Sequence, residues 1–111
     1  MEHFFYAGPS AQPFGIAGVE LHGSVALLRS LVVSEEHRSR GLGSALAERA
    51  EQYARSMGAR CIYLLTTTAE SFFARRGYVP AARDSAPMEI RSTREFADIC
   101  PASSAFMVKQ L

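Results

Sequence analysis

Two arginines and two glycines stand close together between an apolar stretch and a helical pattern. They lie in the segment Arg38-Ser39-Arg40-Gly41-Leu42-Gly43-Ser44, which follows the apolar residues Leu31-Val32-Val33. Glycine lets a backbone approach a ligand closely, and the first N–H groups of a helix have no partner within the helix. The helix dipole adds partial positive charge at that end, and arginine donates charge-assisted hydrogen bonds. The segment therefore predicts a binding site for a diphosphate.

Two other phosphate-binding glycine loops do not fit the spacing. A dinucleotide-binding loop has a third Gly or Ala three residues after the second glycine, where this chain has Leu46. A Walker loop continues Gly-Lys-Ser/Thr, whereas Ser44 follows Gly43 directly. As a bare pattern, the two glycines are equally compatible with a tight turn that binds nothing.

The surrounding pattern predicts the elements that position this loop. Strands are expected over residues 3–7, 14–22 and 24–33, with Gly23 in a hairpin turn and residues 8–13 in a loop. The strand over 24–33 is nearly all apolar, which is typical of a strand covered on both faces. Helical spacing predicts an amphipathic helix over 42–57 that Gly58 ends, followed by an apolar strand over 61–65.

The last third of the chain continues the alternation of helices and strands. A capping box over 67–70 opens a short helix to residue 76, and a strand follows over 78–83. A further helix is expected from Ser92 until Cys100-Pro101, and a closing strand over 105–111. This order predicts one α/β domain over residues 1–111, with a mixed sheet and helical crossovers.

Composition limits the partners. The 111 residues carry twelve basic and eleven acidic side chains, a net charge of +1, which gives no general attraction to nucleic acid or an acidic membrane. The apolar runs are shorter than the ~18 residues of a membrane helix, and no basic leader is present, so a cytoplasmic protein is expected. Cys61 and Cys100 lie far apart with no His pair nearby, which indicates free thiols and no metal site.

In this context the loop resembles a known motif. Arg38-x-x-Gly41-x-Gly43 is similar to the acyl-CoA motif Arg/Gln-x-x-Gly-x-Gly/Ala of the GNAT N-acetyltransferases. The segment 69–78 resembles the short helix and Gly-aromatic strand start that follow later in that family. The resemblance runs from about Phe14 to the C-terminus and implies the GNAT fold, a mostly antiparallel α+β sheet of about six strands. It also implies acetyl transfer from acetyl-CoA to an amine.

One branch of the family looks most similar. The sequence segments 26–33, 63–70 and 90–96, the last followed by Cys100-Pro101, resemble the arsenic-resistance (arsinothricin N-acetyltransferase-like) branch. Those relatives are thought to acetylate the amino group of an arsenic-containing glutamate analogue. The resemblance therefore implies a small-molecule acceptor, an amino acid analogue among the candidates.

The resemblance also implies which residues contact the cofactor. The strand over 31–33 would give backbone groups to the pantetheine and thioester, and would splay from the strand over 62–66 to leave a slot. The expected CoA contacts are Leu31, Val33, Arg38, Ser39, Arg40, Gly41, Leu42, Gly43, Ser44, Thr66 and Phe73.

The usual proton donor of the family is absent. A Tyr on the short helix normally protonates the departing thiolate, but this chain has Phe72 and Phe73 there, which are equally suited to core packing. Tyr78 or a water molecule is expected to donate the proton instead, or the thiolate leaves unassisted. A thiol with a pKa near ~8.5 tolerates the last case.

Four polar residues are candidates for the acceptor side. An amine must lose a proton before attack, and Glu20 is the preferred base, with His22 the neighbouring alternative; both also suit ordinary surface positions. Arg29, followed by Ser30, interrupts an apolar run and is expected to bind a substrate carboxylate. The alternative for Arg29 is an internal pair with Glu20 across the hairpin.

The N-terminal segment suggests association. Residues 1–13 are too few for the helix pair that usually covers the acceptor side in GNAT proteins. The cluster Phe4-Phe5-Tyr6 and the apolar face of the hairpin would be exposed in a monomer, so a symmetric homodimer is expected. Two other functions stay open: a non-catalytic module that binds acyl-CoA, and a small interaction domain whose glycine turn binds nothing.

Overall fold

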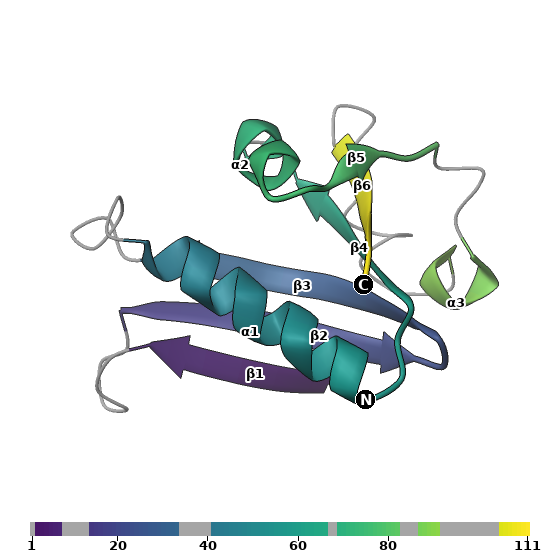
Figure 1. Cartoon of the computed structure of the whole chain (residues 1–111), viewed down its shortest axis with the longest axis horizontal. Coiled ribbons are helices and arrows are strands. Elements are labelled where there is room, and N and C mark those ends of the chain that lie inside the picture. The colour runs from purple at the N-terminus through teal and green to yellow at the C-terminus, as the bar shows by residue number, and fades with distance from the viewer. Residues whose placement is uncertain (1, 8–13, 34–40, 67–68, 83–86, 92–104) are drawn as a thin grey trace.

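A computed structural model gives the structure of the protein and describes residues 2–7, 14–33, 41–66, 69–82, 87–91 and 105–111. The elements follow in the order β1 (Glu2–Ala7), β2 (Gly15–His22), β3 (Val25–Val33), α1 (Leu42–Ser56), β4 (Cys61–Thr66), α2 (Glu70–Arg75), β5 (Val79–Pro80), α3 (Met88–Arg91) and β6 (Ala105–Gln110). The strands form a six-stranded sheet in the order β1-β2-β3-β4-β6-β5 (Figure 1). β3 and β4 pair in parallel, and the other neighbouring strands pair antiparallel. The predicted mixed, mostly antiparallel sheet is confirmed.

Two predicted elements, β5 and α2, differ in their bounds, and one observed helix, α3, was not predicted. β5 is confined to Val79–Pro80 at the sheet edge, where Pro80 has no N–H to extend the ladder. α3 lies at Met88–Arg91, and the helix predicted from Ser92 falls outside the described residues. α2 begins at Glu70 after Ala69, whose N–H donates to Thr66 Oγ1 at 3.0 Å. The capping box is therefore wrong in its register, because Glu70 opens the helix instead of following three residues after its cap.

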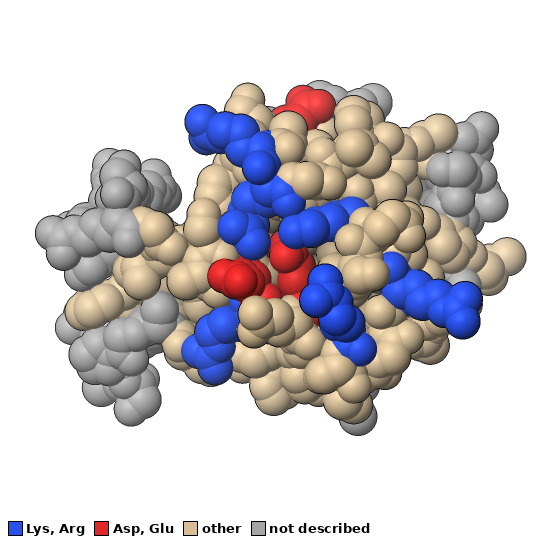
Figure 2. All heavy atoms as spheres, in the orientation of Figure 1, with Lys and Arg blue, Asp and Glu red and all other residues tan. Residues whose placement is uncertain are grey.

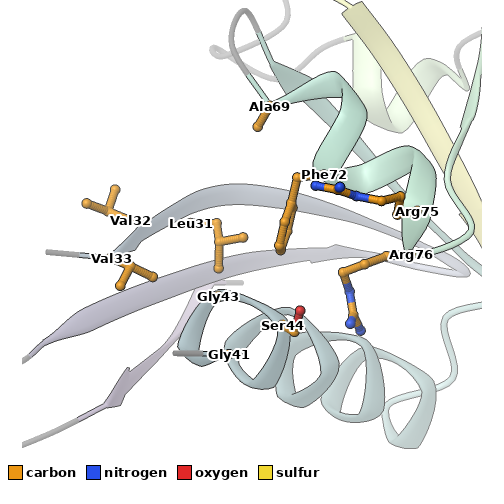
Figure 3. A pocket seen from close by; sticks show the side chains of 10 residues that line it. All are labelled: Leu31, Val32, Val33, Gly41, Gly43, Ser44, Ala69, Phe72, Arg75 and Arg76. Atoms are coloured by element: carbon orange, nitrogen blue, oxygen red, sulfur yellow. The ribbon is translucent and has the colours of Figure 1, made fainter. Parts of the chain in front are cut away.

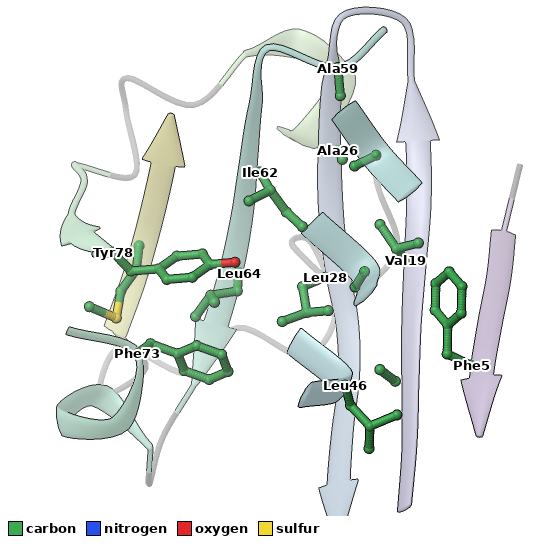
Figure 4. Close-up of a cluster of buried hydrophobic side chains, with 14 residues drawn as sticks. Phe5, Val19, Ala26, Leu28, Leu46, Ala59, Ile62, Leu64, Phe73 and Tyr78 are labelled. Carbon is green, nitrogen blue, oxygen red and sulfur yellow. The ribbon is translucent and has the colours of Figure 1, made fainter. Parts of the chain in front are cut away.

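Helix α1 covers one face of the sheet. The three alanines Ala47, Ala50 and Ala54 are fully buried, which lets the helix axis approach the strands closely. The cluster beneath them contains Phe5, Val19, Ala26, Leu28, Leu46, Ile62, Leu64, Phe73, Tyr78 and Met107 (Figure 4). This packing fixes the position of α1, and therefore of the glycine segment at its start, against β2 and β3.

Among the described residues, α3 and neighbouring side chains cover only part of the other face of the sheet. Val25 and Leu27 of β3 pack with Ile90 of α3 and with Phe106 of β6. The first half of β3 is thus covered on both faces, as predicted for the whole strand. The prediction is wrong for the second half, where Val32 is 59% exposed.

The aromatic cluster near the N-terminus is divided between the two faces by strand alternation. Phe5 is buried against α1, where its ring meets Tyr53 edge-on at 5.5 Å between centroids. Phe4 and Tyr6 point to the opposite face and are 42% and 51% exposed. The predicted exposure therefore holds for two of the three rings.

β3 loses one of its two partner strands halfway along its length. Its parallel pairing with β4 runs from Val25 opposite Cys61 to Leu28 opposite Leu64. At that point its register with β2 shifts, because Val19 pairs with Leu28 and Gly18 with Ser30, which leaves Arg29 as an extra residue. Such a bulge bends the strand and re-aims its side chains. The slot expected between these two strands opens at this bulge.

None of the helices in the described ranges combines the length and apolar character needed to cross a lipid bilayer.

Candidate functional site

A pocket lies where β3 departs from β4. It has a volume of about 900 Å³ and is lined by Leu31, Val32, Val33, Gly41, Gly43, Ser44, Ala69, Phe72, Arg75 and Arg76 (Figure 3). The lining comes from three places: the second half of β3, the start of α1, and α2. The pocket therefore joins the strand slot to the glycine segment.

The two glycines serve the pocket in different ways. Gly41 is the residue before α1 and has φ 79°, a left-handed conformation that other residues adopt at a cost. Gly43 lies within the first turn, and a Cβ there would stand 3.5 Å from the ring of Phe72 and 3.8 Å from Val33. A side chain at residue 43 would fit the fold, but it would take up space between α1 and α2. The missing Cβ keeps the pocket open.

The start of α1 is suited to an anion. No side chain caps the described end of the helix, and its first turn contains no acidic residue. The first hydrogen bond of the helix runs from the N–H of Ala45 to the carbonyl of Gly41 at 3.0 Å. The N–H groups of residues 42–44 consequently have no acceptor inside the helix, and the dipole favours negative charge there.

Two arginines on α2 add positive charge to the pocket and were not predicted as site residues. Arg75 and Arg76 both line it, from the end of α2. Figure 2 shows basic side chains gathered around a small acidic group over α1 and α2. The adjacent basic pair before Gly77 was the signal in the sequence, but only the packing of α2 beside α1 directs it to this pocket.

The predicted CoA contacts are partly brought together. Leu31, Val33, Gly41, Gly43 and Ser44 line one pocket. Arg38, Ser39 and Arg40 lie outside the described residues. Leu42 and Thr66 flank the pocket as the first residue of α1 and the last of β4, and are not among its lining residues.

Phe73 and Tyr78 lie in the core instead of the pocket. The ring of Phe73 is buried between those of Phe72 and Tyr78, at centroid distances of 5.0 Å and 5.3 Å. The hydroxyl of Tyr78 donates to Glu51 Oε2 at 2.9 Å. Burial raises the pKa of Tyr78 well above its usual range, and the negative charge of Glu51 raises it further. The proton-donor role predicted for Tyr78 does not fit this placement, and Phe72 is the aromatic residue that reaches the pocket.

Glu20, His22 and Arg29 form an ionic cluster on the sheet face opposite α1. Glu20 Oε1 lies 2.8 Å from His22 Nε2, and Glu20 Oε2 lies 3.0 Å from Arg29 Nη1. The bulge at Arg29 places this guanidinium on the same face as Glu20. The internal pair considered as the alternative for Arg29 is thus present. Ser30 follows at the bulge, opposite Gly18.

The whole arrangement matches a known family. A model of the acetyltransferase (GNAT) family matches residues 2–78, which is more than half of the chain. The chain belongs to the GNAT family. The resemblance stated from the glycine motif and the Gly-aromatic segment is confirmed at this level.

The chain is similar to proteins named for acetyl transfer. It is 33% identical over 88 residues to an uncharacterized N-acetyltransferase of Chlorobaculum tepidum, covering 78% of this chain and 56% of that protein. It is 36% identical over 69 residues to an amino-acid acetyltransferase of Pseudomonas syringae pv. tomato, covering 62% of this chain and 16% of that protein. The GNAT chain thus spans little more than half of the first relative and a small part of the second.

A solved structure shares the fold. N-acetylglutamate synthase from Neisseria gonorrhoeae, complexed with coenzyme A and N-acetyl-glutamate, superposes with a TM-score of 0.85 at 23% identity. The match covers 97% of this chain and 25% of the synthase chain. The GNAT fold predicted from the sequence is therefore confirmed.

Proposed function

We propose that this GNAT chain transfers an acetyl group from acetyl-CoA to the amine of a small molecule, an amino acid or an amino acid analogue. The observation that carries the proposal is the pocket wall formed by Leu31–Val33 together with Gly41, Gly43 and Ser44, at the point where β3 leaves β4. It combines an open strand edge with a helix start suited to a diphosphate. A CoA ligand needs both along one continuous path.

The residues present fit CoA. The space left by Gly43 and the left-handed turn at Gly41 admit a diphosphate close to the backbone, and Arg76 Nε is a buried donor without a partner among the described residues. The N–H groups opening α1 would hold the diphosphate, together with Arg38, Ser39 and Arg40 of the motif. Leu31, Val33 and Thr66 would line the pantetheine arm, with Phe72 in the place first predicted for Phe73. The relative complexed with coenzyme A supports this assignment.

Positioning carries most of the proposed catalysis. Bound acetyl-CoA supplies a thioester carbonyl, and the chain holds the amine beside it. Such alignment contributes up to about 7–11 kcal/mol to lowering a barrier. With Tyr78 bonded to Glu51 and phenylalanines at 72 and 73, the thiolate is proposed to leave with solvent assistance alone.

The ionic cluster supplies an acceptor site. Arg29 pairs with Glu20, and an amino acid carboxylate would compete for the same guanidinium. Such an acceptor would release Glu20 to take the proton of the amine, while His22 still holds its other oxygen. Recognition of the carboxylate and exposure of the base are thereby coupled. Ser30, beside Arg29 at the bulge, is proposed to line the same site.

The relatives support an amino acid as acceptor. The Pseudomonas syringae pv. tomato protein is named an amino-acid acetyltransferase. The arsenic-containing glutamate analogue implied by the branch resemblance carries the same amine and carboxylate groups. It is therefore the first analogue to test. We further propose a cytoplasmic homodimer that associates through the face of Phe4 and Tyr6, which light scattering at micromolar concentration tests.

One observation favours a second function, a module that binds acyl-CoA without transfer. No tyrosine lines the pocket among the described residues, so the family's usual acid is missing. Calorimetry with CoA and a thiol-release assay across amino acids and small amines separate the two functions. CoA binding with thiol release supports the enzyme, binding alone supports the module, and absence of binding contradicts both.

A further inference from the structure

Glu51 is a charged residue held inside the protein beside the pocket. The residue is 6% exposed. Among the described residues, it is the one charged residue that is buried. It lies on the face of α1 that meets α2, β5 and β6 rather than on the solvent face. A buried carboxylate is costly unless cations and hydrogen bonds surround it. Its partners therefore indicate its role.

Three side chains from other elements converge on Glu51. Lys109 Nζ of β6 donates to Oε1 at 2.9 Å, and the Tyr78 hydroxyl donates to Oε2 at 2.9 Å. Arg76 Nη2 lies 3.5 Å from Oε1. Since the raised pKa keeps Tyr78 protonated, this hydroxyl is a constant donor. One carboxylate thus faces two cations, and the group keeps an excess of positive charge.

The excess charge lies at the pocket wall. Arg76 belongs both to this group and to the pocket lining. Figure 3 shows its side chain pointing from α2 toward α1. Its Nε is buried and has no hydrogen-bond partner among the residues described. An unused buried donor is unfavourable by itself and calls for a ligand or a functional explanation.

We infer that Arg76 is a phosphate-binding residue of the pocket and that Glu51 is the positioning residue that holds its guanidinium there. Glu51 engages one terminal nitrogen of Arg76 and leaves Nε to donate to a phosphate oxygen. Lys109 and Tyr78 keep the carboxylate itself in place. This inference rests on the proposed binding of CoA, and it adds a second anion-binding group that comes from α2 instead of from the glycine segment.

The test measures binding, with no need for turnover. Calorimetry compares CoA, dephospho-CoA and pantetheine on the wild type, Arg76→Gln and Glu51→Gln. Arg76→Gln should weaken the affinity for CoA by about tenfold to a hundredfold, the effect of losing a charge-assisted hydrogen bond. The affinity for pantetheine should stay unchanged. A loss for CoA but not dephospho-CoA assigns the 3′-phosphate; a loss for both assigns the diphosphate. Either result supports the inference.

The double variant separates positioning from a general structural effect. If Glu51 acts through Arg76, Glu51→Gln should weaken CoA by about threefold to tenfold alone and have no further effect when combined with Arg76→Gln. Arg55→Gln is the matched control, because it removes one positive charge from the exposed end of α1, away from the pocket. CoA affinity in this control should stay unchanged.

Three results would overturn the inference. They are an unchanged CoA affinity in Arg76→Gln, an equal loss for pantetheine, or additive losses in the double variant. A wild type that binds no CoA would instead overturn the proposed function and this inference with it. The two failures are therefore distinguishable.

Discussion

The two halves of β3 have similar apolar sequences and different surroundings. Residues 25–28 pair with β2 on one edge and β4 on the other, and their side chains are buried. Residues 31–33 are equally apolar, but the register with β4 has ended and they line the pocket. An apolar run therefore does not by itself distinguish a core strand from the wall of a ligand pocket. The neighbouring strand decides, and Arg29 at the bulge marks the boundary.

The largest effect is expected for a substitution in the first half of β3, and it is an effect on stability. Leu28→Ala should lower the free energy of unfolding by about 2–5 kcal/mol, because Leu28 is buried under α1 and its removal leaves a cavity. Denaturant unfolding followed by circular dichroism measures it. Val32→Ala, in the exposed second half, is the matched control and should change stability by about 0.5 kcal/mol or less. Similar losses of stability in both variants would show that the two halves of β3 do not differ in burial.

At the boundary between the two halves of β3, Arg29→Ala should weaken binding of the acceptor and leave binding of CoA unchanged. We expect KM for an amino acid acceptor to rise by the equivalent of about 1.5–3 kcal/mol, the effect of losing an ionic hydrogen bond, with CoA affinity unchanged. Steady-state kinetics with calorimetry measures both. Arg29→Lys, which keeps the charge, should recover part of the loss. A lowered melting temperature with unchanged KM would assign Arg29 to the internal pair with Glu20 alone.

Next to the second half of β3, Gly43→Ala should weaken binding of CoA while the protein still folds. The added Cβ makes an ordinary contact with Phe72, so the fold tolerates it, but it occupies space that the ligand needs. An overpacking cost of about 1–3 kcal/mol is expected in the binding free energy. The control is Ala45→Ser on the exposed side of the same helix turn, which should bind CoA normally. Unchanged affinity in Gly43→Ala would remove the glycine segment from the site.

The smallest effect is expected for Phe72→Tyr. This change places a phenol, a group able to donate a proton, on the pocket wall. If the thiolate leaves with solvent assistance, kcat should change by about twofold or less. A large gain in kcat, measured in a thiol-release assay, would show that departure of the thiolate limits the reaction.

The sequence was sufficient for the order of helices and strands along the chain and for placing the glycine segment at the start of α1. The helical spacing after Gly41, the apolar strands and the glycines at 23, 58 and 77 are local signals, and they correctly predicted the succession of elements. Local sequence signals could not decide whether Phe72 or Phe73 lines the pocket. That choice depends on the rotation of a six-residue helix, which starts at Glu70 instead of at the predicted capping box.

The contacts of the charged residues could be identified only from the tertiary structure. Glu51 stands in an otherwise polar helix face in the sequence, and its burial follows only from the packing of Tyr78, Arg76 and Lys109 around it. The bulge at Arg29 likewise has no sequence signal: it lies in the pairing of β3 with β2, next to the point where the pairing of β3 with β4 ends. Side-chain networks between distant segments are the part of the site that periodicity cannot predict.

We propose that the second half of β3, together with the start of α1, binds CoA, while the first half belongs to the core. The most direct measurement is a titration of the isotope-labelled protein with CoA, followed by backbone amide chemical shifts. The account predicts large saturable shifts at residues 31–33 and 41–44 and small ones at residues 25–28. Shifts confined to other surfaces, or none at saturating CoA, would contradict it.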